Sequence, residues 1–246
     1  MPAADDYFQQ ALSALAQVAR SQAKTIAAAA ELLVEAIKGN HCLFSFGASH
    51  SFIITEELVY RAGGLMLINP IYPHGMNLAV HPLPLTSRLE RVEGLGRELL
   101  AAAPAKHGDR LIITSTSGRN SIVIDMALQA KAMGLKTIAI TSLAYSQGTK
   151  SRHPSGKKLA EVCDVVIDNG APYGDAALAI PGLRPKVGPL STITGCAIAN
   201  ALVCEVVAQL VKAGIQPPVF MSANQEGGDD WNARRLAENK ARIFYL

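Results

Sequence analysis

The chain has 246 residues, 49% of them hydrophobic and 17% charged, and a formal net charge of +3. This length can bury a sizeable core, and the composition excludes a disordered or fibrous protein. The small net charge gives no support to a nucleic-acid-binding surface. The four cysteines show neither CxxC nor Cys/His spacing, so we predict no zinc site, no disulfide framework and a reducing, cytoplasmic location.

Two segments bear on membrane targeting. The N-terminal stretch MPAADDYFQQ carries acidic residues where a signal peptide needs basic ones, and no apolar core follows it. The longest apolar helix candidate, residues 196–211, is interrupted by Asn200, Glu205 and Gln209, and we expect it to be too short and too polar to span a membrane. The sequence therefore predicts no membrane partner.

The first part of the chain alternates helical and strand patterns. Residues 5–38 are alanine-rich with apolar residues at helical spacing, which predicts one long amphipathic helix or two stacked ones. Gly39 and Asn40 end this segment. The next predicted elements are a buried strand over residues 41–46, a glycine–serine loop over 47–51, a helix over 52–62 and a second strand over 65–68.

A proline-rich segment covers residues 69–86 and contains two histidines, His74 and His81. Long loops in compact domains are often functional. We expect an ordered loop in which His74 closes over a site, with a structural or exposed histidine as the alternative. A helix over residues 87–103 follows it.

The stretch Arg110–Ser121, RLIITSTSGRNS, is the most informative in the chain. Its apolar run predicts a buried strand, which opens into a hydroxyl-rich loop before a helix over residues 121–133. Helix N-terminal N–H groups, hydroxyl donors and a glycine that permits close backbone approach together favour an anion site. The alternative is an ordinary strand-to-helix loop in which Asn120 or Ser121 caps the helix.

The second half continues the alternation. Its predicted elements are, in order, a strand over residues 136–141, a polar loop with a short helix over 142–158, a strand over 164–168, a glycine- and proline-rich surface excursion over 169–187, an apolar helix opened by Ser191 and Thr192 and ending at Lys212, and a final helix over 231–240. Before the last helix, residues 222–230 are either a mobile flap that delivers a carboxylate or a turn in which Asp229 or Asp230 caps the helix.

Strands that alternate with helices predict an α/β fold with a five-stranded parallel sheet covered on both faces. We predict one domain over residues 1–246, with an N-terminal helical segment (5–38), a core (41–213) and a C-terminal loop and helix (214–246). The expected architecture is a flavodoxin-like three-layer αβα sandwich with strand order 2-1-3-4-5. In this order the loops after the first and third strands lie side by side at the switch point, where ligands bind.

These two loops resemble those of the sugar isomerase (SIS) domain family of phosphosugar-binding proteins, and the resemblance covers roughly Asp5 to Lys212. It is carried by a glycine–serine first loop, an S-x-S-G-x-N second loop and a serine–threonine pair that opens the last large helix, namely Gly47, Ser49, Ser51, Ser115, Ser117, Gly118, Asn120, Ser191 and Thr192. The chain is most similar to a single-domain bacterial branch of the family, between phosphoheptose isomerase and N-acetylmuramic acid 6-phosphate etherase.

The resemblance implies a phosphosugar site. Family members hold the phosphate with the second loop and the serine–threonine pair, which implies phosphate-binding roles for Ser115, Thr116, Ser117, Gly118, Asn120, Ser191 and Thr192. The first loop lines the sugar, which implies substrate contacts for Gly47, Ser49 and Ser51, and closure of the proline-rich loop would add His74. Dimers or tetramers are usual, with a neighbouring subunit completing the site, so a homodimer or homotetramer is implied.

Aldose–ketose isomerisation and lactyl ether elimination both begin with removal of a proton next to a carbonyl group, which needs a general base. The resemblance implies a catalytic glutamate on the helix after the first loop, where Glu56 and Glu57 lie. Counted from Ser49, the family position falls near Val59, about one helical turn further on. A solvated or interface carboxylate pair is the alternative. His50 is a candidate acid–base group or donor to substrate hydroxyls, or else a helix cap.

The isomerases also use a histidine on the last large helix, whereas this chain has no histidine after His153. We expect a phosphosugar isomerase that acts by proton abstraction next to a carbonyl, on a sugar phosphate or amino-sugar phosphate, without a cofactor or metal. The alternatives are an etherase-type lyase and a non-catalytic phosphosugar sensor. Nucleotide binding is not favoured, because neither GxGxxG nor a Walker lysine is present.

Overall fold

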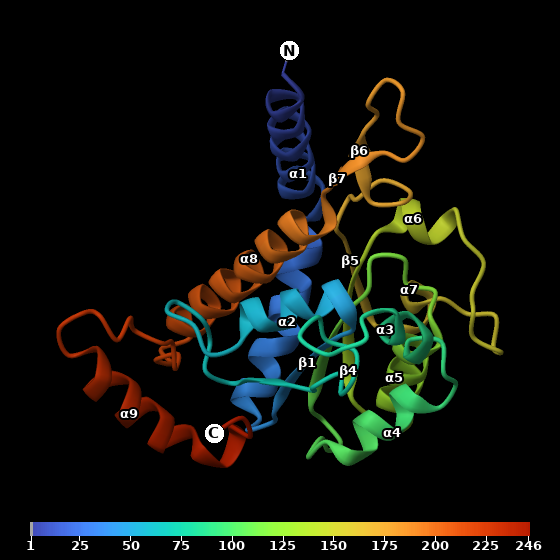
Figure 1. Cartoon of the computed structure of the whole chain (residues 1–246). Helices are drawn as coiled ribbons and strands as arrows, with labels where there is room; N and C mark the ends of the chain where they lie inside the picture. The colour runs from blue at the N-terminus through green and yellow to red at the C-terminus, as the bar shows by residue number, and fades with distance from the viewer. Residues whose placement is uncertain (1) are drawn as a thin grey trace.

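The computed structural model describes residues 2–246 and contains a five-stranded parallel sheet between two layers of helices (Figure 1). The strand order β2-β1-β3-β4-β5 confirms the predicted flavodoxin-like topology. The strands are β1 (Leu43–Gly47), β2 (Ile68–Pro70), β3 (Arg110–Thr114), β4 (Lys136–Thr141) and β5 (Val165–Asp168). β1 and β3 pair in register, with Gly47 opposite Thr114, so the loops that follow these strands leave the sheet side by side.

Each face of the sheet is covered by its own group of helices. Helices α1 (Ala3–Lys38), α2 (Phe52–Leu58) and α8 (Ser191–Lys212) cover one face, and α4 (Leu95–Ala102), α5 (Ser121–Ala132) and α7 (Leu159–Val162) cover the other. Successive strand residues point to opposite faces. Leu43 therefore joins the first core while its neighbour Phe44 joins the second.

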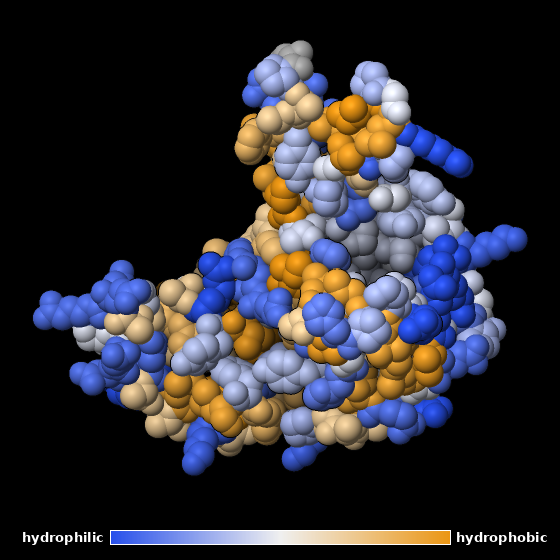
Figure 2. Space-filling view, in the orientation of Figure 1, coloured by the Kyte–Doolittle hydropathy of each residue, from blue (hydrophilic) through white to orange (hydrophobic). Residues whose placement is uncertain are grey.

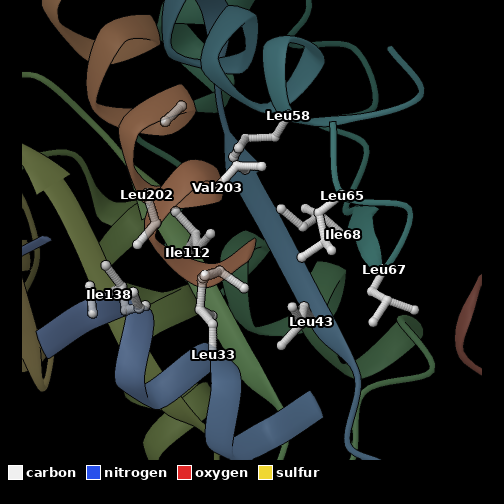
Figure 3. Packing of buried hydrophobic residues seen from close by; sticks show 14 of the residues in the cluster. Leu33, Leu43, Leu58, Leu65, Leu67, Ile68, Ile112, Ile138, Leu202 and Val203 are labelled. Carbon is white, nitrogen blue, oxygen red and sulfur yellow. The ribbon is translucent and has the colours of Figure 1, made fainter. Parts of the chain in front are cut away.

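The core under α1 and α8 is made almost entirely of aliphatic side chains (Figure 3). Leu33 of α1 and Leu202 of α8 meet Ile112 of β3, and each of these side chains is at most 1% exposed. Burial of a leucine or isoleucine side chain contributes about 1.5–3 kcal/mol. This packing holds the N-terminal helix against the sheet, and the segment predicted as one or two helices is a single helix of 36 residues.

Helix α8 corrects one expectation about membranes. Over its full 22 residues it is long and apolar enough to cross a membrane by length and composition, so the expectation that it is too short and too polar was wrong. Its inward-facing residues, including Leu202, Val206 and Leu210, are nevertheless buried in the core beside α1. We assign α8 to the core of the domain.

Helix α2 ends at Leu58, four residues before the predicted end, and β2 begins at Ile68 rather than at residue 65. The cause lies far away in the sequence. The intervening segment pairs with the C-terminal part of the chain, where Gly63 N–H donates to the Phe220 carbonyl (2.9 Å) and Phe220 N–H to the Gly64 carbonyl (3.0 Å). This pairing engages residues 63–66, so the chain enters β2 later than predicted.

The helix predicted over residues 87–103 is two helices, α3 (Pro84–Leu89) and α4. The break falls at Gly94, which adopts a left-handed conformation (φ 81°) that favours glycine. Its N–H donates to Asp125 Oδ2 at 2.6 Å. A Cβ atom at Gly96 would lie 1.9 Å from the Ile122 carbonyl oxygen, so α4 and α5 are in close backbone contact.

The other departures from the predicted elements are local. The excursion over 169–187 contains a strand and leads into a second one, β6 (Ala176–Leu178) and β7 (Val187–Pro189), which form an antiparallel pair. A short helix, α6 (Leu143–Gln147), follows β4. The final helix, α9 (Gly228–Asn239), starts earlier than predicted and its N-cap is Gly227, so Asp229 and Asp230 lie in the first turn and do not cap it.

Candidate functional site

A cavity of about 280 Å³ lies at the carboxyl edge of the sheet, where the loops after β1, β3, β4 and β5 converge. This is the position at which ligands bind in open parallel sheets. Its lining residues are Ala48, Ser49, His50, Ser51, Glu90, Ser115, Thr116, Ser117, Tyr145, Gly174, Asp175 and Ser191. Seven of the residues proposed from the sequence are therefore brought together: Ser49, His50, Ser51, Ser115, Thr116, Ser117 and Ser191.

The loop after β3 is held by its own backbone. Ser115 N–H donates to the Ile140 carbonyl (3.1 Å), and the Thr116 carbonyl accepts from Ser142 N–H (3.0 Å). Gly118 takes a left-handed conformation (φ 59°), and its N–H donates to Ser115 Oγ (3.2 Å). Within residues 2–246, the N–H groups of Thr116 and Ser117 donate to no protein acceptor. Two free N–H groups beside two hydroxyls are donors of the kind that can hold an anion.

The loop after β1 makes a tight turn that brings its serines to the cavity. A Cβ atom at Gly47 would lie 2.3 Å from the Ser51 carbonyl oxygen, so only glycine fits there. Ser49 takes a left-handed conformation (φ 56°), and its N–H donates to the Met76 carbonyl (2.7 Å). Left-handed non-glycine residues cost roughly 1–3 kcal/mol and concentrate at functional sites. Gly47 and Gly118 thus shape the two loops and do not line the cavity.

Ser191 lines the cavity, and its hydrogen bonds are made to an internal carboxylate. Asp175 Oδ1 accepts from the N–H groups of Ser191 (2.8 Å) and Leu190 (3.1 Å), and Asp175 Oδ2 accepts from Ser191 Oγ (2.7 Å). Asp175 therefore caps the N-terminus of α8, whose own N-cap residue, Leu190, has no polar side chain. Thr192, the other member of the predicted pair, does not line the cavity.

Glu90 brings a partly desolvated carboxylate to the same cavity. Its Oε2 accepts from Asn120 Nδ2 (2.7 Å), and Asn120 Oδ1 accepts from Arg152 Nη1 (2.8 Å). Burial raises the pKa of Glu90, and the Asn120 hydrogen bond and the charges of Arg91 and Arg152 oppose this shift. Asn120 stands at the N-cap position of α5, but its side chain makes no capping bond and bonds Glu90 and Arg152 instead.

Positively charged side chains lie near the hydrogen-bonded series Glu90, Asn120 and Arg152. Burial lowers the pKa of Arg152, and the nearby charges of Arg119 and Arg91 lower it further. Three guanidinium groups are thus close enough to interact, with Glu90 as the carboxylate that opposes them. Fixed cations beside free N–H groups favour an anionic ligand.

The remaining candidate residues lie in other surroundings. Glu57 pairs with Arg61 and accepts from Asn200 Nδ2 (2.7 Å). Glu56 lines a separate depression of about 310 Å³, next to Phe52, Thr55, Val59, Tyr60, Pro70 and Tyr72. His74 lines a third depression of about 190 Å³. Of the predicted acid–base groups, His50 is the one that lines the cavity at the carboxyl edge.

Five lining residues were not named as candidates from the sequence: Ala48, which lies inside the glycine–serine loop after β1, and Glu90, Tyr145, Gly174 and Asp175. Three of them follow β4 or β5, and the carboxyl ends of all parallel strands meet at one edge. The position of Tyr145, Gly174 and Asp175 after a predicted strand could therefore have identified them from the sequence. No local pattern marks Glu90, which reaches the cavity because Ile122 N–H donates to its carbonyl at the start of α5 (3.2 Å). Among the described residues, no group of three or more His, Cys, Asp or Glu side chains is arranged to hold a metal ion.

Comparison with known proteins gives three kinds of similarity. The sequence model of the SIS domain matches residues 6–142. A UPF0309 protein of Shouchella clausii is 45% identical over 242 residues, covering 98% of each chain, and a UPF0309 protein of Streptomyces griseus is 42% identical over 243 residues, covering 98% of this chain and 97% of the relative.

Solved structures share the fold at low sequence identity. The phosphoheptose isomerase of Francisella tularensis superposes with a TM-score of 0.54 at 16% identity, over 84% of this chain and 98% of that one. The NanR protein of Vibrio vulnificus, complexed with ManNAc-6P, gives a TM-score of 0.50 at 15% identity, over 99% of this chain and 70% of that one. At these identities the likeness concerns the fold alone.

Proposed function

The chain belongs to the SIS domain family, and on this basis we propose that it binds a sugar phosphate or amino-sugar phosphate in the cavity at the carboxyl edge of the sheet. The observation that carries the proposal is the pair of unpartnered N–H groups at Thr116 and Ser117, beside their own hydroxyls and the serines of the β1 loop. A structural neighbour that binds ManNAc-6P supports the same ligand class.

The phosphate and the sugar take different parts of the cavity in this proposal. The phosphate accepts from the Thr116 and Ser117 N–H and hydroxyl groups, and Arg91, Arg119 and Arg152 supply the favourable field. The sugar hydroxyls face the β1 loop, whose Ser49, His50 and Ser51 offer donors and acceptors.

We propose isomerisation as the reaction, with Glu90 as the general base. An ionised Glu90 removes the proton from the carbon next to the carbonyl group, which leaves an enediolate, and returns it to the neighbouring carbon. His50 moves the proton between the two oxygens. The raised pKa of Glu90 suits a base that must also release its proton, because proton transfer is most efficient near matched pKa values. We assign the base role to Glu90 in preference to Glu56 and Glu57, which do not line the cavity.

Assembly and location complete the proposal. We propose a homodimer or homotetramer in the cytoplasm. The N-terminal part of α1 projects beyond the sheet (Figure 1), and its exposed apolar side chains Phe8 and Leu12 supply surface for such contacts.

The decisive experiment separates binding from chemistry. Sugar phosphates and the matching unphosphorylated sugars are first screened by thermal shift, since a ligand selective for the native state raises Tm. We expect shifts with the phosphorylated members alone. Each hit is then incubated with the protein in D₂O, and the proton next to the carbonyl is followed by ¹H NMR. Exchange of this proton supports the isomerase. A hit that binds without exchange would leave a sensor, and release of a second product would identify a lyase.

A further inference from the structure

A second cavity, of about 550 Å³, lies at the opposite edge of the sheet, where β1 and β3 begin. Three segments that are distant in sequence form it: residues 40–42, 104–109 and 238–244. The five residues of β3 separate it from the loop that begins at Ser115, which corresponds to about 15 Å. The two cavities share no lining residue.

The wall formed by the C-terminal segment is fixed in place. Asn69, which is 1% exposed, donates from Nδ2 to the Arg242 carbonyl (2.9 Å) and accepts from Phe244 N–H at Oδ1 (2.7 Å). The ring of Phe244 stacks on that of Phe44, with centroids 6.1 Å apart. The cavity is therefore preformed, and its volume lies in the range of small-molecule sites.

Two cations of this cavity have no carboxylate partner among the described residues. The guanidinium group of Arg242 is held by the Ile37 carbonyl (3.1 Å from Nη1) and Asn239 Oδ1 (2.7 Å from Nη2), which leaves its positive charge uncompensated. The Lys106 ammonium group has no hydrogen-bond partner within residues 2–246. Both cations lower the pKa of the Cys42 thiol, which burial and then Asp109 raise, so both lie near this one side chain.

The acidic residues of the cavity are already engaged. Asp109 Oδ1 accepts from Cys42 N–H (2.8 Å), and Asp109 Oδ2 accepts from Lys106 N–H (2.7 Å). Glu238 pairs with Arg235 (2.7 Å). Neither carboxylate therefore pairs with Lys106 or Arg242, although the charge of Asp109 acts on the same thiol as the two cations.

Two imidazole rings complete the polar lining. The ring of His41 lies against Gly108, where a Cβ atom would come within 2.3 Å of it, and the ring of His107 lies against Gly134 at the same distance. The backbone at both glycines thus makes room for a ring at the cavity wall. Imidazole N–H groups are further donors for an oxyanion.

We propose that this cavity is a second ligand site, which binds the phosphate group of a small phosphate monoester between Lys106 and Arg242. A guanidinium and an ammonium group that line one cavity, neither of them paired with a carboxylate, match a dianionic oxyanion. Phe244 and Pro104 give the rest of the ligand an apolar surface. This site does not depend on the function proposed for the carboxyl edge.

Cys42 provides a reporter for the proposal, because its half-buried thiol lies beside both cations. The folded protein is alkylated with neutral iodoacetamide, and the modification of each cysteine is measured by mass spectrometry of its peptides, with exposed Cys204 as the internal standard. Inorganic phosphate is the probe, and chloride at equal ionic strength is the control. We expect phosphate to slow alkylation of Cys42 in a saturable manner and to leave Cys204 unchanged. Equal rates in phosphate and chloride would overturn the proposal.

Variants assign the effect to this cavity. Lys106→Met changes an exposed side chain without a partner, so the fold is retained, and Arg242→Met removes the second cation. Each change should raise the phosphate concentration that gives half-maximal protection of Cys42 by at least about 10-fold. Lys24→Met, on the exposed side of α1, should leave this concentration unchanged. The double change Ser115→Ala, Ser117→Ala in the other cavity should leave Cys42 protection intact. Protection that is lost in this double variant and kept in Lys106→Met would refute the second site.

Discussion

The side chain that best defines the candidate site is Glu90, because its environment is set by two further residues. Asn120 donates to it, and Arg152 donates to Asn120. The carboxylate is thereby oriented toward the cavity while burial raises its pKa. In the proposed reaction this arrangement separates two roles: Glu90 would act on the ligand, and Asn120 and Arg152 would hold the Glu90 carboxylate in position.

Glu90→Gln tests the role of the carboxylate. Glutamine keeps an oxygen that accepts from Asn120, so the fold and phosphosugar binding should persist, while turnover should fall by about 10²–10⁴, the usual contribution of a general base. The stability profile is a second readout. A carboxyl group with a raised folded-state pKa holds its proton more tightly when folded, so stability falls as pH rises from the ordinary value of 4.5 through the raised one. The Tm of the variant relative to wild type should therefore increase over this interval. Unchanged turnover would remove Glu90 from the mechanism.

Arg152→Met tests the positioning role. Arg152 opposes the raised pKa of Glu90, so its loss should raise that pKa further. The acidic limb of the kcat/KM profile should then move to higher pH, because a larger fraction of Glu90 is protonated at a given pH. Arg152→Lys retains the positive charge, so its acidic limb should lie close to the wild-type position. If the acidic limb stays at the wild-type pH in Arg152→Met, Arg152 does not control the pKa of Glu90.

At the scale of elements, the cavity depends on a hydrogen-bonded contact between the segment after β5 and the N-terminus of α8. The N-terminus of α8 has no capping side chain of its own, and Asp175, from the glycine-rich segment after β5, supplies the acceptor. The same carboxylate fixes the start of the β6–β7 pair and holds Ser191 at the cavity. One residue thus joins the last core helix, the small hairpin and the site.

Asp175→Ala should destabilise the protein. Loss of a cap costs about 0.5–2 kcal/mol, which for a chain of this size lowers Tm by roughly 1–8 °C. Asp175 also adopts a left-handed conformation (φ 69°), which asparagine tolerates better than alanine. Asp175→Asn is therefore the matched control and should retain most of the stability. Thermal unfolding followed by circular dichroism measures both, and equal Tm values for the two variants would argue against the cap.

On the scale of the whole molecule, the N-terminal part of α1 and the β6–β7 hairpin form an arm that projects beyond the sheet (Figure 1). At 36 residues α1 is about 54 Å long. Tyr7 donates to the Pro189 carbonyl (2.9 Å), which joins the two parts of the arm. The arm carries exposed apolar side chains, including Phe8 (63% exposed) and Leu12 (59% exposed), and Figure 2 shows apolar surface gathered on it.

Phe8→Glu tests whether the arm contacts a second copy of the chain. A charge placed in an apolar interface is costly to bury, so we expect the variant to sediment as a smaller species than wild type in analytical ultracentrifugation. Gln9→Glu introduces the same charge one residue away, on a different side of the helix, and should leave the assembly unchanged. A monomeric wild-type protein would contradict the proposed oligomer directly.

The sequence by itself determined the sheet and the place of the site. Strands buried on both faces appear as short apolar runs, and β1, β3 and β4 were recognisable for this reason. The glycine–serine loops after β1 and β3 are equally local features, and the strand order then made them neighbours. These properties depend on residues close together in the chain, which is why pattern and spacing were sufficient.

Only the tertiary structure decided how the site is completed. Glu90 meets Asn120, Asp175 meets Ser191, and Gly63 pairs with Phe220, each across a long interval of sequence. No local pattern encodes such contacts, because each partner has a complete local explanation as a helix cap, a turn or a helix end. The same reason applies to the second cavity, whose three segments come together only when the C-terminal residues fasten to Asn69 at the edge of the sheet.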